Sequence, residues 1–429
     1  MLKIVRDWLW LESSQWKSKE ELSLAQLSKL KQTTERAYQL VPFYRALYDK
    51  AGASPPIIFS LEDIRTLPKA TREQYRDAPL DTRTAKRIDA SSCCQMTTSG
   101  STGMPLTVLL ESRAATYRDA LNLRMLRAYG VGPLDRVCRV RGGFGREADL
   151  SARWAVKRGL WGRYRDNRYR LLFFSGNIRE HLDFFLKWKP TVLIAAGSYC
   201  KTLIEASENE GEELAFKVVV TTAELSDSST RKLIQERFSA GVFDHYANEE
   251  LGSIAWECPS HAGYHVNSES SLVEVLKDGE LHTEGEVHVT SFYQMATPLI
   301  RYATGDMATM TQEECPCGRG LGLLKAVQGR ILDFITTGGG GRVSPIAVVA
   351  ALETIRGVEQ YKLTQNNDLS IDAQLRVDES NRQPATRELR SRCRILFGEL
   401  PVQIRFVESI EMAGSKFRLI ESHAKGPAS

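Results

Sequence analysis

The sequence predicts an α/β protein with a large N-terminal domain of layered, mostly parallel sheets and helices, and a small, mobile C-terminal α+β domain. Residues 191–246 alternate strand-like and helix-like runs with short connections, which favours parallel strands. A glycine-rich stretch follows residue 329, and beyond it come about one hundred residues of shorter elements. We therefore place the two domains at 1–329 and 330–429.

The first part of the chain is predicted to be mainly helical. Apolar residues recur at spacings of three and four between residues 20 and 50, which is typical of an amphipathic helix. After a loop at 97–103, alternating apolar residues predict a strand over 106–110, and a long helix follows over 112–129. The apolar positions of the first helical region are Leu24, Leu27, Leu30, Ala37, Leu40, Tyr44 and Leu47.

The middle of the chain has the clearest pattern. Buried strands are expected at 191–197, 216–222 and 241–246, because each is a short apolar run bounded by turn residues. Helices are expected at 198–210 and 226–238, the second with a hydroxyl and acid N-cap. Ligands of parallel sheets usually bind at the carboxyl ends of the strands, so we expect the functional site there.

The C-terminal domain is expected to contain two helices and three strands. Four consecutive glycines at 338–341 follow the domain boundary and favour a swivel between the two domains. The predicted helices span 344–356 and 386–397, and the predicted strands span 358–364, 369–376 and 401–407.

Composition excludes several classes of function. The chain has 57 Lys and Arg against 53 Asp and Glu, a net charge of +4, without long basic runs, so nucleic acid is not the expected partner. The densest basic stretch, 157–170, is interpreted as a solvated face or a loop near an anionic ligand. No apolar run reaches the roughly 18–20 residues of a membrane span, and the start lacks a signal-peptide core. We expect a cytoplasmic protein without a membrane span.

The stretch "TTSGSTG" at 97–103 is rich in hydroxyls and glycines. Such a loop offers uncrowded backbone N–H groups and hydroxyl donors, which suits phosphate oxygens. It is not a Walker A loop, because no lysine precedes the Ser/Thr and a strand rather than a helix follows. Phosphate binding is one interpretation, and a plain surface loop is the other.

Other segments follow this loop in a recognisable order. They are "TTAEL" (221–225), "YANEE" (246–250), "RYATGDMATM" (301–310), "GRILDF" (329–334) and "GSKFRLIES" (414–422). With "TTSGSTGMPL" they resemble the adenylate-forming superfamily of acyl-CoA synthetases, peptide-synthetase adenylation domains and luciferases. The N-terminal "VPFYRALYDKAG" is similar to the phenylacetate-CoA ligase branch, which includes coenzyme F390 synthetase-like and CapK-like proteins. The resemblance covers essentially the whole chain.

This resemblance implies an ATP-dependent, AMP-forming acid ligase. A carboxylate attacks the α-phosphate of ATP to give acyl-AMP and pyrophosphate, and the acyl group then passes to CoA. One alternative is transfer to an amine, a hydroxyl or a carrier-protein thiol in a biosynthetic pathway. Another is a non-catalytic relative that binds nucleotide as a scaffold. The expected small molecules are ATP or AMP, Mg²⁺ and CoA, with a flat aromatic or small acid as substrate; a homodimer is also expected.

The resemblance also implies roles for individual residues. Glu250 would hold Mg²⁺, Lys416 would approach the forming acyl phosphate, and Thr98 would act from the phosphate loop. The acid would contact Phe144, Ser198 and Tyr199. The nucleotide would contact Ser99, Gly100, Ser101, Thr102, Gly103, Ala223, Glu224, Tyr246, Asp306 and Arg330.

Two departures from the family motifs matter. "YANEE" has Ala247 for the motif's glycine and Glu249 for its Thr or Ser, which adds a carboxylate beside Glu250. At the hinge, Leu332 replaces an acid while Asp333 is kept. A leucine there does not favour the same solvated pivot, so adenylation is better supported than thioester formation.

Five cysteine and histidine residues have spacings that suit a metal. Cys315 and Cys317 form a Cys-x-Cys pair, and Cys258 and His265 form a Cys-x₆-His pair, which together predict a tetrahedral, structural Zn²⁺ site. His261 is the substitute for His265. The alternative is a set of unrelated core thiols and imidazoles.

Overall fold

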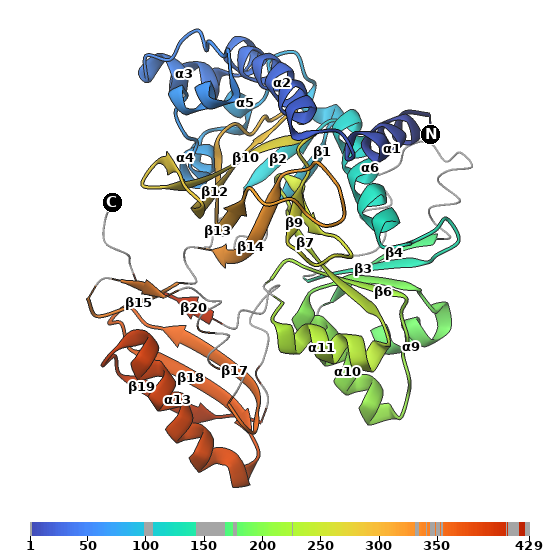
Figure 1. Cartoon of the computed structure of the whole chain (residues 1–429), viewed down its shortest axis with the longest axis vertical. Coiled ribbons are helices and arrows are strands. Elements are labelled where there is room, and N and C mark those ends of the chain that lie inside the picture. The colour runs from blue at the N-terminus through green and yellow to red at the C-terminus, as the bar shows by residue number, and fades with distance from the viewer. Residues whose placement is uncertain are drawn as a thin grey trace.

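The chain folds around one large mixed sheet and a separate C-terminal sheet (Figure 1). The computed structural model describes residues 2–97, 106–142, 168–174, 178–224, 226–330, 334–339, 341–343, 348, 352, 355–408, 410 and 420–424. The large sheet has twelve strands in the order β11-β10-β12-β13-β14-β9-β8-β7-β6-β5-β3-β4. The order shows that consecutive hairpins form one part of the sheet and crossover connections form the other.

Helices α2 and α3 pack together above the antiparallel part of the sheet, and α1 packs on α6 (Ser112–Ala128) (Figure 1). Ser18 and Glu21 form a capping box that starts α2, and Pro42 starts α3, so the single helical region expected over 20–50 is two helices broken at Val41. This region contains α1 (Leu2–Ser14), α2 (Lys19–Leu40), α3 (Pro42–Lys50), η1 (Leu61–Thr66), α4 (Arg72–Asp77), α5 (Leu80–Arg83) and η2 (Ala90–Ser92). A small ribbon follows, made of β1 (Cys94–Thr97) and β2 (Thr107–Leu110).

The strands of the middle region are parallel, as predicted. Helices α9 (Ile178–Trp188), α10 (Gly197–Glu210) and α11 (Ser228–Phe238) pack their apolar side chains on one face of this part of the sheet, and α6 (Ser112–Ala128) covers the other face. The strands are β3 (Val137–Gly142), β4 (Tyr169–Phe174), β5 (Val192–Ala195), β6 (Val218–Thr222) and β7 (Gly241–Asn248). Burial on both faces explains their unbroken apolar runs.

The remaining strands of the large sheet are antiparallel, so the expectation of mostly parallel strands holds only for β3 to β7. Several of them are buried on both faces, as β8 and β12 show. These strands are β8 (Gly252–Glu257), β9 (Tyr264–Val266), β10 (Ser271–Lys277), β11 (Glu280–Leu281), β12 (Glu284–Ser291), β13 (Tyr302–Thr311) and β14 (Leu323–Arg330).

The C-terminal elements form a sheet of their own with a helix against it (Figure 1). The three expected strands are present as β17 (Val358–Gln365), β18 (Ile371–Val377) and β19 (Val402–Phe406), and the expected second helix is α13 (Arg382–Phe397), preceded by η4 (Glu379–Asn381). A fourth strand, β20 (Ile420–Ser422), was not expected and pairs in parallel with β17. A short ribbon of β15 (Ile335–Thr336) and β16 (Arg342–Val343) precedes them, and the predicted helix at 344–356 lies mostly outside the described residues. The boundary at 329/330 stays a prediction.

Within the part of the chain that the structure describes, no helix has the length and apolarity of a membrane span.

Candidate functional site

Glu250 lies in the turn between β7 and β8 and is almost fully buried, with 2% of its surface exposed. Its Oε1 accepts hydrogen bonds from Arg72 Nη1 at 3.0 Å and from the Tyr302 hydroxyl at 3.1 Å. Burial, and then the charge of Glu250, raise the pKa of Tyr302 well above its usual range, so this hydroxyl remains a donor. Ala70 pairs with Tyr302 and thereby places Arg72, at the start of α4, beside the carboxylate.

Asp306 lies on β13, and its Oδ2 accepts a hydrogen bond from the Tyr246 hydroxyl at 2.7 Å. Burial, and then the charge of Asp306, raise the pKa of Tyr246 well above its usual range. Tyr246 and Glu250 are four residues apart, as are Tyr302 and Asp306. The two bonds therefore join the end of β7 to β13, although three strands separate β7 from β13 in the order of the sheet. The sheet bends so that these two strands face each other.

Arg118 of α6 holds the backbone of the same turn. Its Nη1 donates to the carbonyl oxygen of Glu249 at 3.0 Å and its Nη2 to that of Glu250 at 2.6 Å. Gly252 has a φ of +74°, and a Cβ there would lie 2.9 Å from Arg118 Nε, so a glycine is needed at this position. Sequence reasoning missed Arg72 and Arg118, because an arginine in a helix carries no signal of the turn it will reach.

Ser198 and Glu224 lie at the carboxyl ends of β5 and β6 and bind each other. Glu224 Oε1 accepts from the Ser198 backbone N–H at 2.5 Å, and its Oε2 accepts from the Ser198 hydroxyl at 3.0 Å. The carboxylate thus caps the first turn of α10, where a negative charge is favourable. Ala223 precedes it with a φ of 74°, in the left-handed region. Contacts of these three residues with a nucleotide or an acid stay predictions.

Tyr199 points into the core between the sheet and the helices α9, α10 and α11. Only 3% of it is exposed, and its hydroxyl lies 2.8 Å from Nδ1 of His181. Burial raises the pKa of Tyr199 well above its usual range. The structure gives this side chain a packing role, and its predicted contact with an acid stays untested.

Other predicted residues lie outside the described residues. Arg330 is described only by its backbone, which pairs with Asp306 across β13 and β14. The predicted residues that the structure does not describe are Thr98, Ser99, Gly100, Ser101, Thr102, Gly103, Phe144, Leu332, Asp333 and Lys416.

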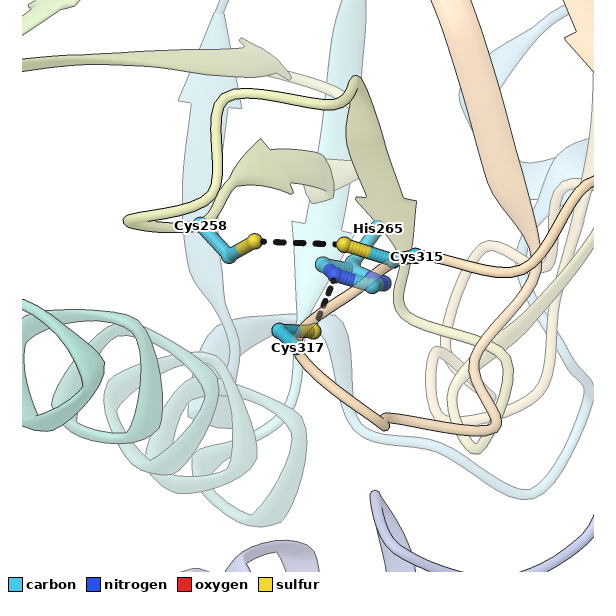
Figure 2. A group of neighbouring side chains, drawn as sticks. All are labelled: Cys258, His265, Cys315 and Cys317. Atoms are coloured by element: carbon cyan, nitrogen blue, oxygen red, sulfur yellow. Dashed lines mark hydrogen bonds between the residues drawn. The ribbon is translucent and has the colours of Figure 1, made fainter.

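Four of the predicted metal ligands come together at the other end of β8 (Figure 2). Cys258 follows β8, His265 is in β9, and Cys315 and Cys317 lie on the loop between β13 and β14. Their ligand atoms all lie within 4.8 Å of one another. Cys258 Sγ is 3.5 Å from Cys315 Sγ, and Cys317 Sγ is 3.2 Å from His265 Nε2. His261 instead pairs with Glu257 at 3.0 Å, so the structure favours His265.

The chemistry of this Cys–His centre fits a zinc ion. Burial, with the positive charges of Arg319 and Arg124, lowers the pKa of His265 to about 4, which keeps the imidazole neutral as a ligand. Burial raises the pKa of Cys315 to about 12, whereas for Cys317 hydrogen bonds, chiefly from Arg319, outweigh burial and lower it. Three sulfur donors and one imidazole are a tetrahedral zinc set, and with four protein ligands such a site is closed and structural.

The loop that carries Cys315 and Cys317 also rests on the turn between α1 and α2. Arg319 Nε donates to Gln15 Oε1 at 2.8 Å, and its guanidinium lies over the Trp16 and Trp256 rings. Gly320 has no room for a side chain, because a Cβ there would fall on the carbonyl oxygen of Lys17. The Cys–His centre is therefore packed directly against the N-terminal helices.

No family model matches the chain. Curated relatives do match the chain. It is 28% identical over 391 residues to the phenylacetate-coenzyme A ligase of Thermus thermophilus, and this match covers 86% of this chain and 84% of the relative. It is 29% identical over 317 residues to that of Escherichia coli, covering 68% of each. A shorter match, 26% over 139 residues and 32% of this chain, is to the indoleacetate–lysine synthetase of Pseudomonas savastanoi. These relatives confirm the resemblance that the ordered motifs indicate.

Solved structures confirm the fold. A 2-hydroxyisobutyryl-CoA ligase in its postadenylation state superposes with a TM-score of 0.80 at 20% identity, over 96% of this chain and 91% of that one. The same ligase in its thioesterification state gives 0.64 at 22% identity, over 95% and 90%.

Proposed function

We propose that this chain, which is related over most of its length to the phenylacetate-CoA ligases of the adenylate-forming superfamily, is an ATP-dependent ligase that activates a carboxylic acid as acyl-AMP and passes the acyl group to CoA. The observation that carries the proposal is the pairing of Tyr246 with Asp306 and of Glu250 with Tyr302. These pairs bring motif residues 52 and 60 positions apart in sequence to one place.

The residues present suit the first half-reaction. The Asp306 carboxylate, oriented by Tyr246, would accept hydrogen bonds from the ribose hydroxyls. Glu250 would hold Mg²⁺, which neutralises phosphate charge when bound, and the carboxylate oxygens suit that ion. Arg72 pairs with Glu250 at 3.0 Å and fixes that carboxylate in position. Thr98 to Gly103 and Lys416 complete the proposed site from segments outside the described residues.

CoA is the proposed acceptor in the second half-reaction, because the relatives matched over most of the chain are named as CoA ligases. The partial match to a synthetase that is named for joining indoleacetate to lysine supports an amine as the alternative acceptor. Adding CoA, lysine or a carrier-protein thiol to a preformed acyl-AMP, and identifying the product by mass, separates these acceptors.

The test of adenylation is pyrophosphate release from Mg-ATP across a panel of acids, with hydroxylamine as the acceptor. We expect AMP and one hydroxamate, and a drop of about 10- to 100-fold in kcat/KM for ATP in Asp306→Asn, because a charge-assisted hydrogen bond is worth about 1.5–3 kcal/mol. Asp278→Asn, in an exposed turn, is the matched control. ATP binding without pyrophosphate for any acid would favour the scaffold alternative, and ADP as the product would exclude adenylation.

The Cys–His centre would hold a structural zinc ion through Cys258, His265, Cys315 and Cys317. Metal analysis of the purified protein is expected to find about one zinc per chain, and replacement of Cys315 and Cys317 by serine is expected to abolish it. Full zinc in that double variant would contradict the assignment. A homodimer and a cytoplasmic location stay predictions, which light scattering and cell fractionation test.

A further inference from the structure

Arg141 and Glu249 form an ion pair that reaches across the carboxyl edge of the parallel strands. Arg141 is in β3, and Glu249 follows β7, with β5 and β6 between these two strands in the sheet. This edge is where ligands of parallel sheets bind. The pair therefore spans the ends of the two strands that lead to Ser198 and Glu224.

The pair is open to a ligand, in contrast to its neighbour. The side chains of Arg141 and Glu249 are 24% and 32% exposed, whereas Glu250 is 2% exposed in its pair with Arg72. Glu249 is adjacent in sequence to Glu250, and Arg118 donates to the carbonyl oxygens of both, so the pair belongs to the same turn as the proposed Mg²⁺ site. A carboxylic acid that attacks a phosphate must bind next to that site.

The surroundings of Arg141 are rich in positive charge. Arg139 is two residues earlier on the same face of β3, and Arg118 bonds the Glu249 carbonyl. Burial, with the charges of Arg139 and Arg118, lowers the pKa of Arg141 to about 10. Among the described residues, Glu249 is the acid that the structure pairs with this guanidinium. A guanidinium has five N–H donors and accepts carboxylates in a planar fork, so it can hold a second anion.

The carboxylate of Glu249 and this arginine form a matched pair. Glu249 stands where the family motif has Thr or Ser, and Arg141 supplies the opposite charge. An apolar acid chain gains nothing from a charged pair and must displace the water around it. An acid with a second negative group instead meets a fixed, partly desolvated guanidinium.

We propose that Arg141 selects the substrate by binding a second anionic group on it, so that the acid activated here is a dicarboxylic acid. Glu249 occupies part of the guanidinium in the free enzyme and keeps it oriented towards the acid. This inference rests on the proposed function, because it names the class of acid that is adenylated.

The experiment compares matched acids in the pyrophosphate and hydroxamate assay. Each pair differs only in a carboxylate against a methyl group: glutarate with valerate, adipate with hexanoate, and 4-carboxyphenylacetate with 4-methylphenylacetate. For at least one pair we expect the wild type to have about 10-fold higher kcat/KM for the dicarboxylate, since a pocket that pairs a substrate charge discriminates strongly against its absence. Arg141→Gln should reduce that ratio about 10-fold, mainly through KM, with Arg141→Lys intermediate.

Two further variants separate this role from a structural one. Glu249→Gln removes the competing carboxylate and should lower the KM of the preferred dicarboxylate. Arg179→Gln, which removes an arginine from an exposed pair with Glu210, controls for the loss of an ion pair and should leave the ratio unchanged.

The outcomes distinguish this inference from the proposed function. Hydroxamate from the methyl acids with no preference for any dicarboxylate in the wild type would overturn the role of Arg141 and leave adenylation standing. A dicarboxylate preference that Arg141→Gln and Arg141→Lys both keep would also overturn it. No hydroxamate from any acid would overturn the proposed function itself. The wild-type panel decides the substrate class even where a variant does not fold.

Discussion

The two ends of β8 carry two different kinds of cluster. Before the strand, Glu249 and Glu250 each face an arginine that comes from a distant segment. After it, Cys258 joins two more thiols and an imidazole whose ligand atoms face one another. The first cluster has its charges balanced by the protein, whereas the second would gain its full stabilisation from the proposed metal ion. The difference teaches that the two ends should lose stability for different reasons. The charged end should be destabilised by removal of an arginine, and the thiol end by removal of the proposed metal ion.

The largest expected effect is at the thiol end. Cys258→Ser should lower the free energy of unfolding by about 4 kcal/mol, because it opens a closed metal site whose binding energy contributes to folding. A zinc chelator should have a similar effect on the wild type in urea unfolding.

Cys393→Ala is the control, since Cys393 is buried in the C-terminal core away from the centre. Cys393→Ala should lower the free energy of unfolding by less than Cys258→Ser does, and it should leave the response to the chelator unchanged. Stability of Cys258→Ser equal to wild type would show that no metal holds this end.

The next effect is at the charged end. Arg72→Ala leaves the buried Glu250 without its cation and should cost about 3 kcal/mol of unfolding free energy. The double variant with Glu250→Gln should recover part of that loss, because no buried charge is then left unpaired.

Lys232→Ala, which breaks an exposed pair with Glu236, should cost less than about 0.5 kcal/mol. If Arg72→Ala cost no more than this control, the balance of charge at this end would be unimportant.

A third effect tests the contact of the thiol end with the N-terminal helices. Gly320→Ala should cost about 2 kcal/mol, because its Cβ would fall on the Lys17 carbonyl and force the α1–α2 turn away. Gly322→Ala is the matched control, since a Cβ there meets Ser268 Oγ at an ordinary 3.6 Å. Hydrogen exchange should show faster exchange at 14–18 only in the first variant. Equal exchange at 14–18 in both variants would show that the loop carrying Cys315 and Cys317 does not support the turn between α1 and α2.

The smallest effect is a pH dependence of stability at His245, which pairs with Trp256 of β8. Burial, with the charge of Arg139, lowers the pKa of His245 to about 3, whereas an unfolded histidine titrates near 6.5. Between these values the unfolded chain binds one more proton, so stability falls as the pH falls, by about 1.4 kcal/mol per pH unit. His245→Gln should lose that contribution in urea unfolding between pH 4.5 and 6. Parallel stability curves for the two proteins would refute this assignment.

Local patterns predicted the parallel strands and the members of the Cys–His centre. The runs at 191–197, 216–222 and 241–246 correspond to β5, β6 and β7, because burial on both faces leaves an apolar stretch that is visible in sequence. The Cys-x-Cys and Cys-x₆-His spacings identified four residues that the fold does bring together. A bound zinc remains a proposal.

The antiparallel strands and the arginines could not be predicted in this way. Strands such as β8 are buried on both faces and lack the alternation that marks a half-exposed strand. Arg72 and Arg118 reach Glu250 over 178 and 132 residues, and nothing distinguishes them among 57 basic residues until the chain is folded. Tyr199 also shows what the fold adds to local reasoning: it follows a strand end, and its helix places it in the core. Its contact with an acid stays a prediction.

β8 is six residues long, with Glu250 two residues before it and Cys258 directly after it. Successive side chains of a strand point to opposite faces, so one inserted or deleted residue would turn one of these two clusters to the wrong side of the sheet. Either cluster can therefore change by substitution, but neither tolerates a change in the length of this strand. The fixed length of β8 therefore sets the position of both clusters at once.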